Sequence, residues 1–139
     1  MSDAVKGLRE LEEKLKRLET ATAVKALRSA ALASTLPTVK EMKAAAPKGK
    51  GTHRTYKGRL VAPGFLSRSV KRVTRHRDGY LSVSIGVKRE AFYGVTFLDR
   101  GTKHIPAKKW FVSRFESNAN SIVSLFKAKL ADRIKKAAQ

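Results

Sequence analysis

The sequence predicts a single α+β domain over residues 1–139, with N-terminal helices, a small antiparallel β-sheet built on a hairpin, and a long C-terminal helix. Three observations predict it. Of the 139 residues 42% are hydrophobic, enough to bury one modest core. Apolar residues recur every three or four positions near both ends of the chain, which is the period of an amphipathic helix. Between these regions, alternating apolar residues follow Asp78-Gly79, a pair favoured in hairpin turns.

Residues 1–20 predict an amphipathic N-terminal helix. Its apolar positions are Val5, Leu8, Leu11, Leu15 and Leu18. This narrow stripe has the width of a coiled-coil seam, so it suits packing on its own domain or on a neighbouring subunit.

Residues 21–46 are alanine-rich and predict a second helical stretch. We expect Pro37 to break or kink it, because proline lacks an amide donor and crowds the preceding turn.

Residues 47–64, PKGKGTHRTYKGRLVAPG, predict a flexible basic loop that becomes ordered only against a partner. The stretch contains no acidic residue, and its glycines favour a mobile backbone. Its cations are Lys48, Lys50, Arg54, Lys57 and Arg59. A Walker phosphate loop requires G-x-x-x-x-G-K-[ST] between a strand and a helix. Here Gly51 follows Gly49-Lys50 and Ala44 stands at the first glycine position, so nucleotide hydrolysis is not expected.

The second half of the chain predicts a hairpin followed by helices. Residues 64–76 are strand-like after a helical turn, and apolar residues alternate again from Leu81 to Val87. Residues 91–99 predict a short helix, with Gly101 as its left-handed terminator. From Pro106 or Ala107 onward the pattern is helical again and ends in a long amphipathic helix with lysines near its C-terminus.

The net charge of +20, from 31 Lys and Arg against 11 Asp and Glu, is the main anomaly of the composition. Between Met42 and Arg77 the chain has eleven basic residues and no acidic one. This density predicts an anionic partner, of which polyphosphate backbones are the commonest, or else a solvated basic surface. The alanine-rich helix offers no Asn, Gln or Arg set to read base edges, so generic phosphate contact is favoured over sequence-specific DNA binding.

Residues that could carry catalysis are sparse. Without cysteine, neither disulfides nor thiolate chemistry are available. His53, His76 and His104 fall in three segments without an i, i+4 pair, so we predict no metal site and no cofactor. We expect the carboxylates of Asp99 and Glu116 to form structural salt bridges with Arg100 or Arg114. The protein is therefore predicted not to be an enzyme. No apolar run approaches the roughly 20 residues of a membrane span, so no membrane partner is expected.

Three motifs occur in an order that resembles a known family. They are Ala45-Ala46-Pro47, then Gly64-Phe65-Leu66-Ser67-Arg68-Ser69-Val70, then FYGVTFLDRGTKHIPAKKWFVSRFES at residues 92–117. This order is similar to that of the gene-ten-like tail-component family of long-tailed bacteriophages, also called tail-completion or head-tail joining proteins. The resemblance spans roughly residues 20–138. The sequence departs from the family pattern at Leu98-Asp99-Arg100, where a Glu is usual, and at Lys108-Lys109-Trp110, where Arg-Pro-Phe is usual.

The resemblance implies an α+β protomer that forms a ring, expected to be hexameric, at the head-proximal end of the tail or in the neck. Such a ring ends tail-tube growth and joins tail to head, with a virion location after assembly in the host cytoplasm. Its partners would be other copies of the chain and tail-tube, neck or connector proteins, with room for nonspecific contact with genomic DNA. The expected turn and subunit interface comprises Tyr93, Phe97, Asp99, Gly101, Thr102, Pro106 and Trp110. We expect Trp110 at a protein contact because large aromatic residues dominate interface energies.

Two alternatives stay open at this point. One is a free basic nucleic-acid-binding accessory protein, for which the charge is the main argument. The other is a portal-side adaptor or closure ring in a different layer of the neck. For the basic loop we consider an acidic neighbouring ring and the DNA path. We favour the protein neighbour, because a lumen densely lined with fixed positive charge would retard DNA.

Overall fold

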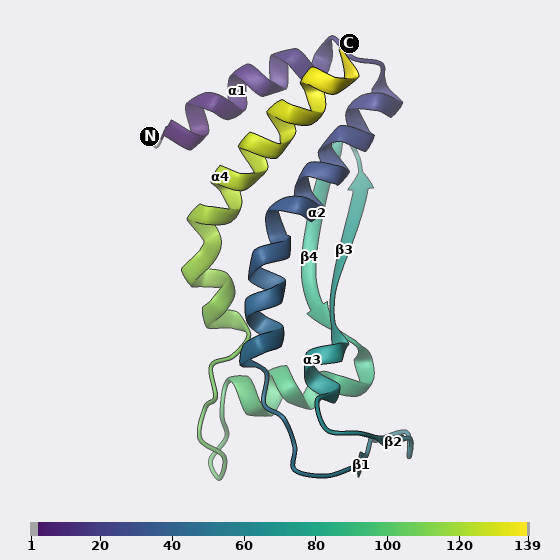
Figure 1. Ribbon diagram of the computed structural model, residues 1–139, viewed down its shortest axis with the longest axis vertical. Coiled ribbons are helices and arrows are strands. Elements are labelled where there is room, and N and C mark those ends of the chain that lie inside the picture. Colours follow the sequence, from purple (N-terminus) through teal and green to yellow (C-terminus); the bar gives the residue numbers. More distant parts are fainter. Residues whose placement is uncertain (1–2, 139) are drawn as a thin grey trace. The chain divides into compact units, whose positions relative to one another are not determined.

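The computed structural model describes residues 3–138, and their side chains from residue 7 onward. Figure 1 labels the elements. In chain order they are α1 (Asp3–Lys16), α2 (Thr20–Ala45), β1 (His53–Arg54), β2 (Leu60–Val61), α3 (Phe65–Ser69), β3 (Val70–Arg77), β4 (Tyr80–Val87), the 3-10 helix η1 (Arg89–Ala91), the π-helix η2 (Gly94–Asp99) and α4 (Val112–Ala137). The predicted α+β class, with N-terminal helices, small antiparallel sheets and a long C-terminal helix, is confirmed.

The residues divide into two compact units. Unit 1 comprises Met1–Leu36, Val73–Ser84 and Ala119–Gln139, and unit 2 comprises Pro37–Arg72 and Ile85–Asn118. The elements α2, β3, β4 and α4 contribute residues to both units.

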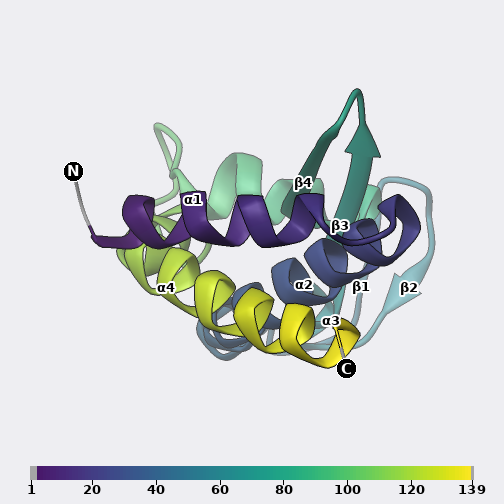
Figure 2. The same ribbon diagram turned by 90° about the horizontal axis from the view of Figure 1, so that it is seen from above.

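Unit 1 has a helical, aliphatic core. Figures 1 and 2 both show α1 beside the C-terminal part of α4. The buried residues of this core are Leu11, Ala26, Ala30, Leu130 and Ile134. Leu15 and Leu18 of the predicted leucine stripe pack against it, so this part of the stripe contacts its own chain. The side chain of Val5 lies outside the described residues.

Pro37 does not break the second helix, because α2 runs from Thr20 to Ala45 without interruption. Of the two expected effects, a break or a kink, the break is therefore wrong. Proline lacks the amide that would donate to the Ala33 carbonyl. The hydroxyl groups in the turn before it bond carbonyls further back in the helix. Ser34 Oγ donates to the Ala31 carbonyl at 2.9 Å, and Thr35 Oγ1 donates to the same oxygen at 3.0 Å. These hydroxyl groups are buried and satisfied within the helix.

The predicted hairpin is confirmed. Strands β3 and β4 pair in a two-stranded sheet, joined by Asp78 at φ 53° and Gly79 at φ 80°. Two successive positive φ angles are the signature of a type I′ turn, which matches the twist of the flanking strands. Along β4, partly buried residues alternate with exposed ones up to Ile85.

The segment after the hairpin differs from the predicted helices. The expected short helix at 91–99 is a 3-10 turn followed by the π-helix η2, and Gly101 adopts the expected left-handed conformation with φ 81°. The last helix starts at Val112, so the predicted start at Pro106 or Ala107 is wrong. Backbone amides before it are engaged elsewhere: Lys108 N donates to the Leu98 carbonyl at 2.8 Å.

Unit 2 has a core built around aromatic residues. Its buried members are Val39, Met42, Ala46, Val61, Phe65, Leu66, Val70, Ala91, Trp110 and Phe111. Trp110 and Phe111 meet edge to face with ring centroids 5.2 Å apart. This core supports the candidate site, because every predicted site residue belongs to unit 2.

Candidate assembly surface

The basic loop, residues 47–64, has regular structure within it. Strands β1 and β2 pair antiparallel, with His53 opposite Val61 and Arg54 opposite Leu60. Thr55 N donates to the Arg59 carbonyl at 2.8 Å, and Gly58 N donates to the Thr55 carbonyl at 2.8 Å. These short strands were not predicted, whereas the expected flexibility of the loop stays a prediction. Its short strands were invisible to pattern reasoning, because a two-residue strand has no measurable alternation.

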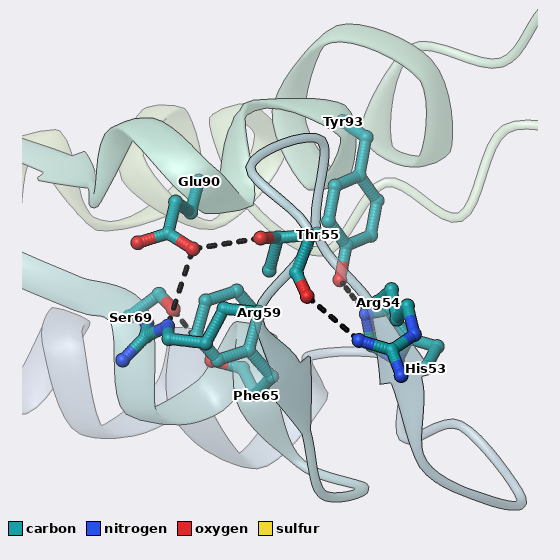
Figure 3. A network of polar contacts seen from close by, with 9 residues as sticks. His53, Arg54, Thr55, Arg59, Phe65, Ser69, Glu90 and Tyr93 are labelled. Carbon is teal, nitrogen blue, oxygen red and sulfur yellow. Dashed lines mark hydrogen bonds and ion pairs between the residues drawn. The ribbon is translucent and has the colours of Figure 1, made fainter.

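Two anchors tie the basic loop to the rest of unit 2. The first is His53, whose Nε2 forms a 2.8 Å hydrogen bond with the Tyr93 hydroxyl. The second is Glu90, whose Oε2 accepts from Thr55 Oγ1 at 2.8 Å and from Arg59 Nε at 3.2 Å. Figure 3 shows these side chains converging from the loop and from the segment after β4. The anchors hold the loop at β1 and at the turn that joins β1 to β2.

The surroundings of the two anchors shift the pKa values of Glu90 and Tyr93. The hydrogen bond from Thr55 lowers the pKa of Glu90 below 4.5, and the charge of Arg59 acts in the same direction against the opposing effect of burial. Burial raises the pKa of the Tyr93 hydroxyl above 10.0. Glu90 is therefore an anion, and Tyr93 is a neutral donor or acceptor, at neutral pH.

The predicted loop cations are all exposed. They are Lys48, Lys50, Arg54, Lys57 and Arg59. Arg59 pairs with Glu90, and Arg54 Nη1 donates back to the Gly58 carbonyl at 2.9 Å. The loop therefore presents its positive charge to solvent while its backbone is held in place.

Three exposed aromatic rings contact one another beside this loop. We call Tyr56, Phe92 and Phe97 the aromatic ridge. Their exposed fractions are 56%, 42% and 41%, respectively. The centroid of Phe92 lies 5.7 Å from that of Tyr56 and 5.9 Å from that of Phe97. Solvated rings at this spacing offer a contiguous apolar surface.

Sequence reasoning found only part of the aromatic ridge. Phe97 was among the predicted interface residues, whereas Tyr56 and Phe92 were not. Phe92 and Phe97 are five positions apart, a spacing that α-helical periodicity does not bring together, and they meet beside the π-helix η2. Nothing local indicates Tyr56, because it is 36 positions away from Phe92 and meets it only through the fold. Tyr93, the remaining aromatic residue of the predicted interface, is half-buried and forms an anchor instead.

Trp110 and Asp99 are structural, which corrects their predicted interface role. Trp110 is 1% exposed and donates from Nε1 to the Gly94 carbonyl at 2.9 Å. Asp99 is 4% exposed, and its carboxylate accepts from the amides of Phe111 at 2.7 Å and Val112 at 3.3 Å. A carboxylate at this position satisfies free amides at the start of α4 and interacts favourably with the helix dipole. Neither side chain is available to a partner.

The turn at Gly101 and Thr102 closes on itself. A Cβ at position 101 would lie 2.8 Å from the amide nitrogen of Ala107, so only glycine fits. Thr102 Oγ1 accepts from the amide of Ile105 at 3.0 Å. Pro106 is exposed at the end of this turn. The structure thus gives Gly101 and Thr102 a turn-forming role and leaves Pro106 on the surface.

The expected salt bridges of Asp99 and Glu116 with Arg100 or Arg114 are not the ones that form. Arg114 pairs instead with Glu41 at 3.2 Å, and Asn118 donates to the same carboxylate at 2.8 Å. This connects the end of α2 to the start of α4 within unit 2. Asp99 binds backbone amides instead, which removes its need for a cation.

Unit 1 contains a different kind of concavity. An apolar pocket of about 470 Å³ is formed by residues of α1, α2, β4 and α4. Its lining is mainly aliphatic and includes Leu27, Leu81 and Ile122, with Glu12 as its one acidic residue.

No protein-family model, curated protein or solved structure matches the chain. Among the described residues, no helix is both long and apolar enough to cross a membrane. Over the same part of the chain, no group of three or more His, Asp or Glu side chains is placed to hold a metal ion.

Proposed function

We propose that the protein is a structural virion component that forms a ring, expected to be hexameric, at the head-proximal end of a phage tail or in the neck. The ring would end tail-tube growth and join tail to head. The order of the three sequence motifs and the α+β fold with its central hairpin support this proposal. The observation that carries it is the exposed aromatic ridge in unit 2.

The aromatic ridge has the properties of a protein-binding surface. Tyrosine and other large side chains are over-represented among the residues that dominate binding energy. Contiguous exposed apolar patches on soluble proteins often mark interaction sites. Tyr56 and Phe92 contact each other, and their neighbours Thr55 and Tyr93 form the loop anchors. A surface fixed before binding loses little conformational entropy on docking, which favours affinity.

Charge predicts how this association depends on salt. Each copy carries +20, so copies repel one another at low ionic strength, and screening weakens that repulsion. Apolar contacts through the aromatic ridge are not weakened in the same way. A contact between the ridge of one copy and a different surface of the next is heterologous and can close into a ring. Self-association should therefore strengthen as salt increases.

Sedimentation velocity of the purified chain at about 0.1 M and about 0.5 M salt, below and above physiological ionic strength, tests this. We expect a closed oligomer that is more populated at the higher salt concentration. Phe92→Ala should shift the population to monomer. Phe115→Ala is a matched control, because Phe115 is an exposed phenylalanine of unit 2, 45% exposed, outside the ridge. A wild-type chain that stays monomeric at both salt concentrations, also in the presence of purified tails, would contradict the ring.

A second candidate function, the free nucleic-acid-binding accessory protein, is favoured by the charge of unit 2, with 17 Lys and Arg against 4 Asp and Glu. It predicts the opposite salt response: a small species whose DNA affinity falls steeply as salt rises. A portal-side adaptor ring would share the oligomeric state of the tail ring. Labelling the C-terminus and locating it in imaged virions distinguishes those two layers.

A further inference from the structure

Unit 2 has a second cationic feature. Of its three charged residues, only Arg59 belongs to the predicted basic loop. The feature is a pocket of about 300 Å³. Its lining residues are Arg59, Leu60, Val61, Ala62, Phe65, Arg68 and Lys88. This lining includes three cations and no acidic residue.

Arg68 is held in place by the backbone. Its Nη1 donates to the Pro63 carbonyl at 2.8 Å and its Nη2 donates to the Ala62 carbonyl at 3.0 Å. Gly64 allows this approach: its φ is 87°, and a Cβ there would lie 2.9 Å from Nη1 of Arg68. The guanidinium is therefore positioned before any ligand arrives.

Arg59 is positioned by Glu90 and by an aromatic ring. Its Nε bonds Glu90 at 3.2 Å, and its guanidinium carbon lies 5.7 Å from the centroid of the Phe65 ring. Glu90 is not among the residues that line the pocket. Arg59 bonds Glu90 through Nε, so its terminal nitrogen atoms keep donors for another acceptor.

Lys88 completes the set. Its backbone amide donates to the Ser69 carbonyl at 3.0 Å, which fixes the main chain at this position. Its side chain is exposed, and within residues 7–138 its ammonium group forms no ion pair with a carboxylate. Counting Glu90 against the three cations leaves an excess charge of two at the pocket.

We propose that this pocket, formed by Arg59, Arg68 and Lys88, binds a backbone phosphate of duplex DNA. Guanidinium groups offer paired N–H donors that match phosphate oxygens, and lysine adds a compact point charge. The other lining residues are apolar, so beyond these three cations the pocket offers no Asn, Gln, Asp or Glu side chain for reading a base edge. Binding through phosphate alone is independent of sequence.

The surroundings favour a polymer over a free anion. Unit 2 carries 17 basic against 4 acidic residues, a field that acts on many phosphates at once. Duplex DNA presents one negative charge about every 1.7 Å along its axis, so one phosphate in the pocket brings others close to neighbouring cations. The site needs only a folded unit 2. It would operate in a monomer or in a ring, so its failure and that of the proposed assembly can be separated.

The test compares two charge reversals of equal size in the full-length chain. Lys88→Glu changes the pocket, whereas Lys25→Glu changes an exposed lysine of α2 in unit 1. Binding to a short labelled duplex of mixed sequence is measured by fluorescence anisotropy over a series of salt concentrations. We expect Lys88→Glu to weaken binding about tenfold and Lys25→Glu to have a much smaller effect. Lys88→Ala should reduce the slope of log affinity against log salt by about 0.9, the value for one phosphate contact.

Further measurements distinguish loss of the phosphate site from unfolding, from a general effect of net charge and from binding of a small anion. Circular dichroism checks that each variant is folded, and Lys88→Arg, which keeps the charge, should bind DNA like the wild type even if Lys88→Glu is unstable. Equal losses for Lys88→Glu and Lys25→Glu would overturn the proposal, because net charge alone would then explain binding. Displacement of the duplex by inorganic phosphate at an equal phosphate concentration would assign the pocket to a small free anion instead. Sedimentation of Lys88→Glu reports separately on assembly, which should be unchanged.

Discussion

The buried cores of units 1 and 2 are built from different kinds of side chain. Unit 1 buries aliphatic and alanine side chains that helices present at regular spacing, such as Leu11, Ala30 and Leu130. Unit 2 contains eight of the ten aromatic residues of the chain and buries polar groups such as Asp99 among irregular segments. The first arrangement depends on periodicity and the second on individual side-chain-to-backbone bonds. Specific contacts in unit 2 should therefore tolerate substitution less well.

The units also differ in surface chemistry. Unit 1 has 14 basic and 7 acidic residues, whereas unit 2 has 17 and 4. Unit 1 contains an apolar concavity and another lined by Lys14, Arg17 and Lys135, while unit 2 carries the exposed aromatic ridge and a cationic pocket of its own. Irregular segments held on a rigid base are where binding residues tend to concentrate. The greater excess of basic residues and the exposed aromatic ridge are the surface features that distinguish unit 2 from unit 1.

Trp110→Ala should have the largest effect on stability. It removes a fully buried ring and leaves the Gly94 carbonyl without its donor, so we expect a loss of about 3–5 kcal/mol. Leu130→Ala is the counterpart in unit 1, with an expected loss of about 2–5 kcal/mol. Hydrogen exchange followed by mass spectrometry should show lost protection centred on residues 94–111 for the first variant and on α1 for the second. The same uniform loss in both would mean that the chain opens as one unit.

A pair of glycine substitutions compares the two units at the same backbone conformation. Gly101 in unit 2 and Gly79 in unit 1 have φ angles of 81° and 80°. A left-handed alanine costs about 1–2 kcal/mol at either position. At Gly101 the new Cβ would also press on the backbone of Ala107, adding about 1–3 kcal/mol, while at Gly79 it meets nothing within 4 Å. Thermal unfolding should rank Gly101→Ala as clearly the more destabilised, and equal melting temperatures would count against the tight turn.

The anchor at Glu90 should make the basic loop sensitive to pH. Its pKa is lowered in the folded state, chiefly by the hydrogen bond from Thr55. Its stabilising contribution is therefore fully present above its ordinary pKa of 4.5 and is lost as the pH falls through the lower, folded value. The NMR signal of the Thr55 amide should move on acidification from neutral pH to about pH 3. Glu90→Gln should weaken the anchor already at neutral pH and reduce this shift, whereas Glu116→Gln should leave it intact.

Neutralising the basic loop should have the smallest effect on folding. Replacing Lys48, Lys50, Arg54, Lys57 and Arg59 together by Gln should cost little stability, because exposed pairs contribute roughly 0–1 kcal/mol each. We expect impaired head-tail joining in a complementation assay that counts joined particles, because the charges act through their summed field. Single changes should be nearly silent. The matched control neutralises Lys14, Lys16, Lys25, Lys129 and Lys135, exposed cations of unit 1. Equal defects would remove any special role of the loop.

The contrast between periodic packing and individual side-chain bonds also explains which features could be predicted from the sequence. Helical spacing correctly placed Leu11 in a core, and Asp78-Gly79 identified the hairpin turn, because each signal is local. The left-handed Gly101 was predicted for the same reason. These features depend on residues close together in the chain, for which backbone sterics and periodicity suffice.

Other features depend on which residues bond to each other across the fold. Asp99 was expected to bind an arginine, but it accepts from the amides of Phe111 and Val112, which exist as free donors only because α4 starts there. Trp110 was expected on a surface because its helix was predicted to begin too early. The anchors of the basic loop join His53 to Tyr93 and Thr55 to Glu90 across the chain. No local pattern specifies such pairs.

The sequence separation of these anchors also bears on the order in which contacts form during folding. The bonds of Asp99 with Phe111 and of Trp110 with Gly94 span only 12 and 16 positions, whereas those of Thr55 with Glu90 and of His53 with Tyr93 span 35 and 40. Loop-closure entropy grows with the length of chain to be closed, and local contacts tend to form early. We therefore expect Tyr56 to reach Phe92 after the segment that carries Phe92 has folded. In the proposed ring, the aromatic ridge would then be completed last, and a newly made chain would be kept from joining its neighbours before it is fully folded.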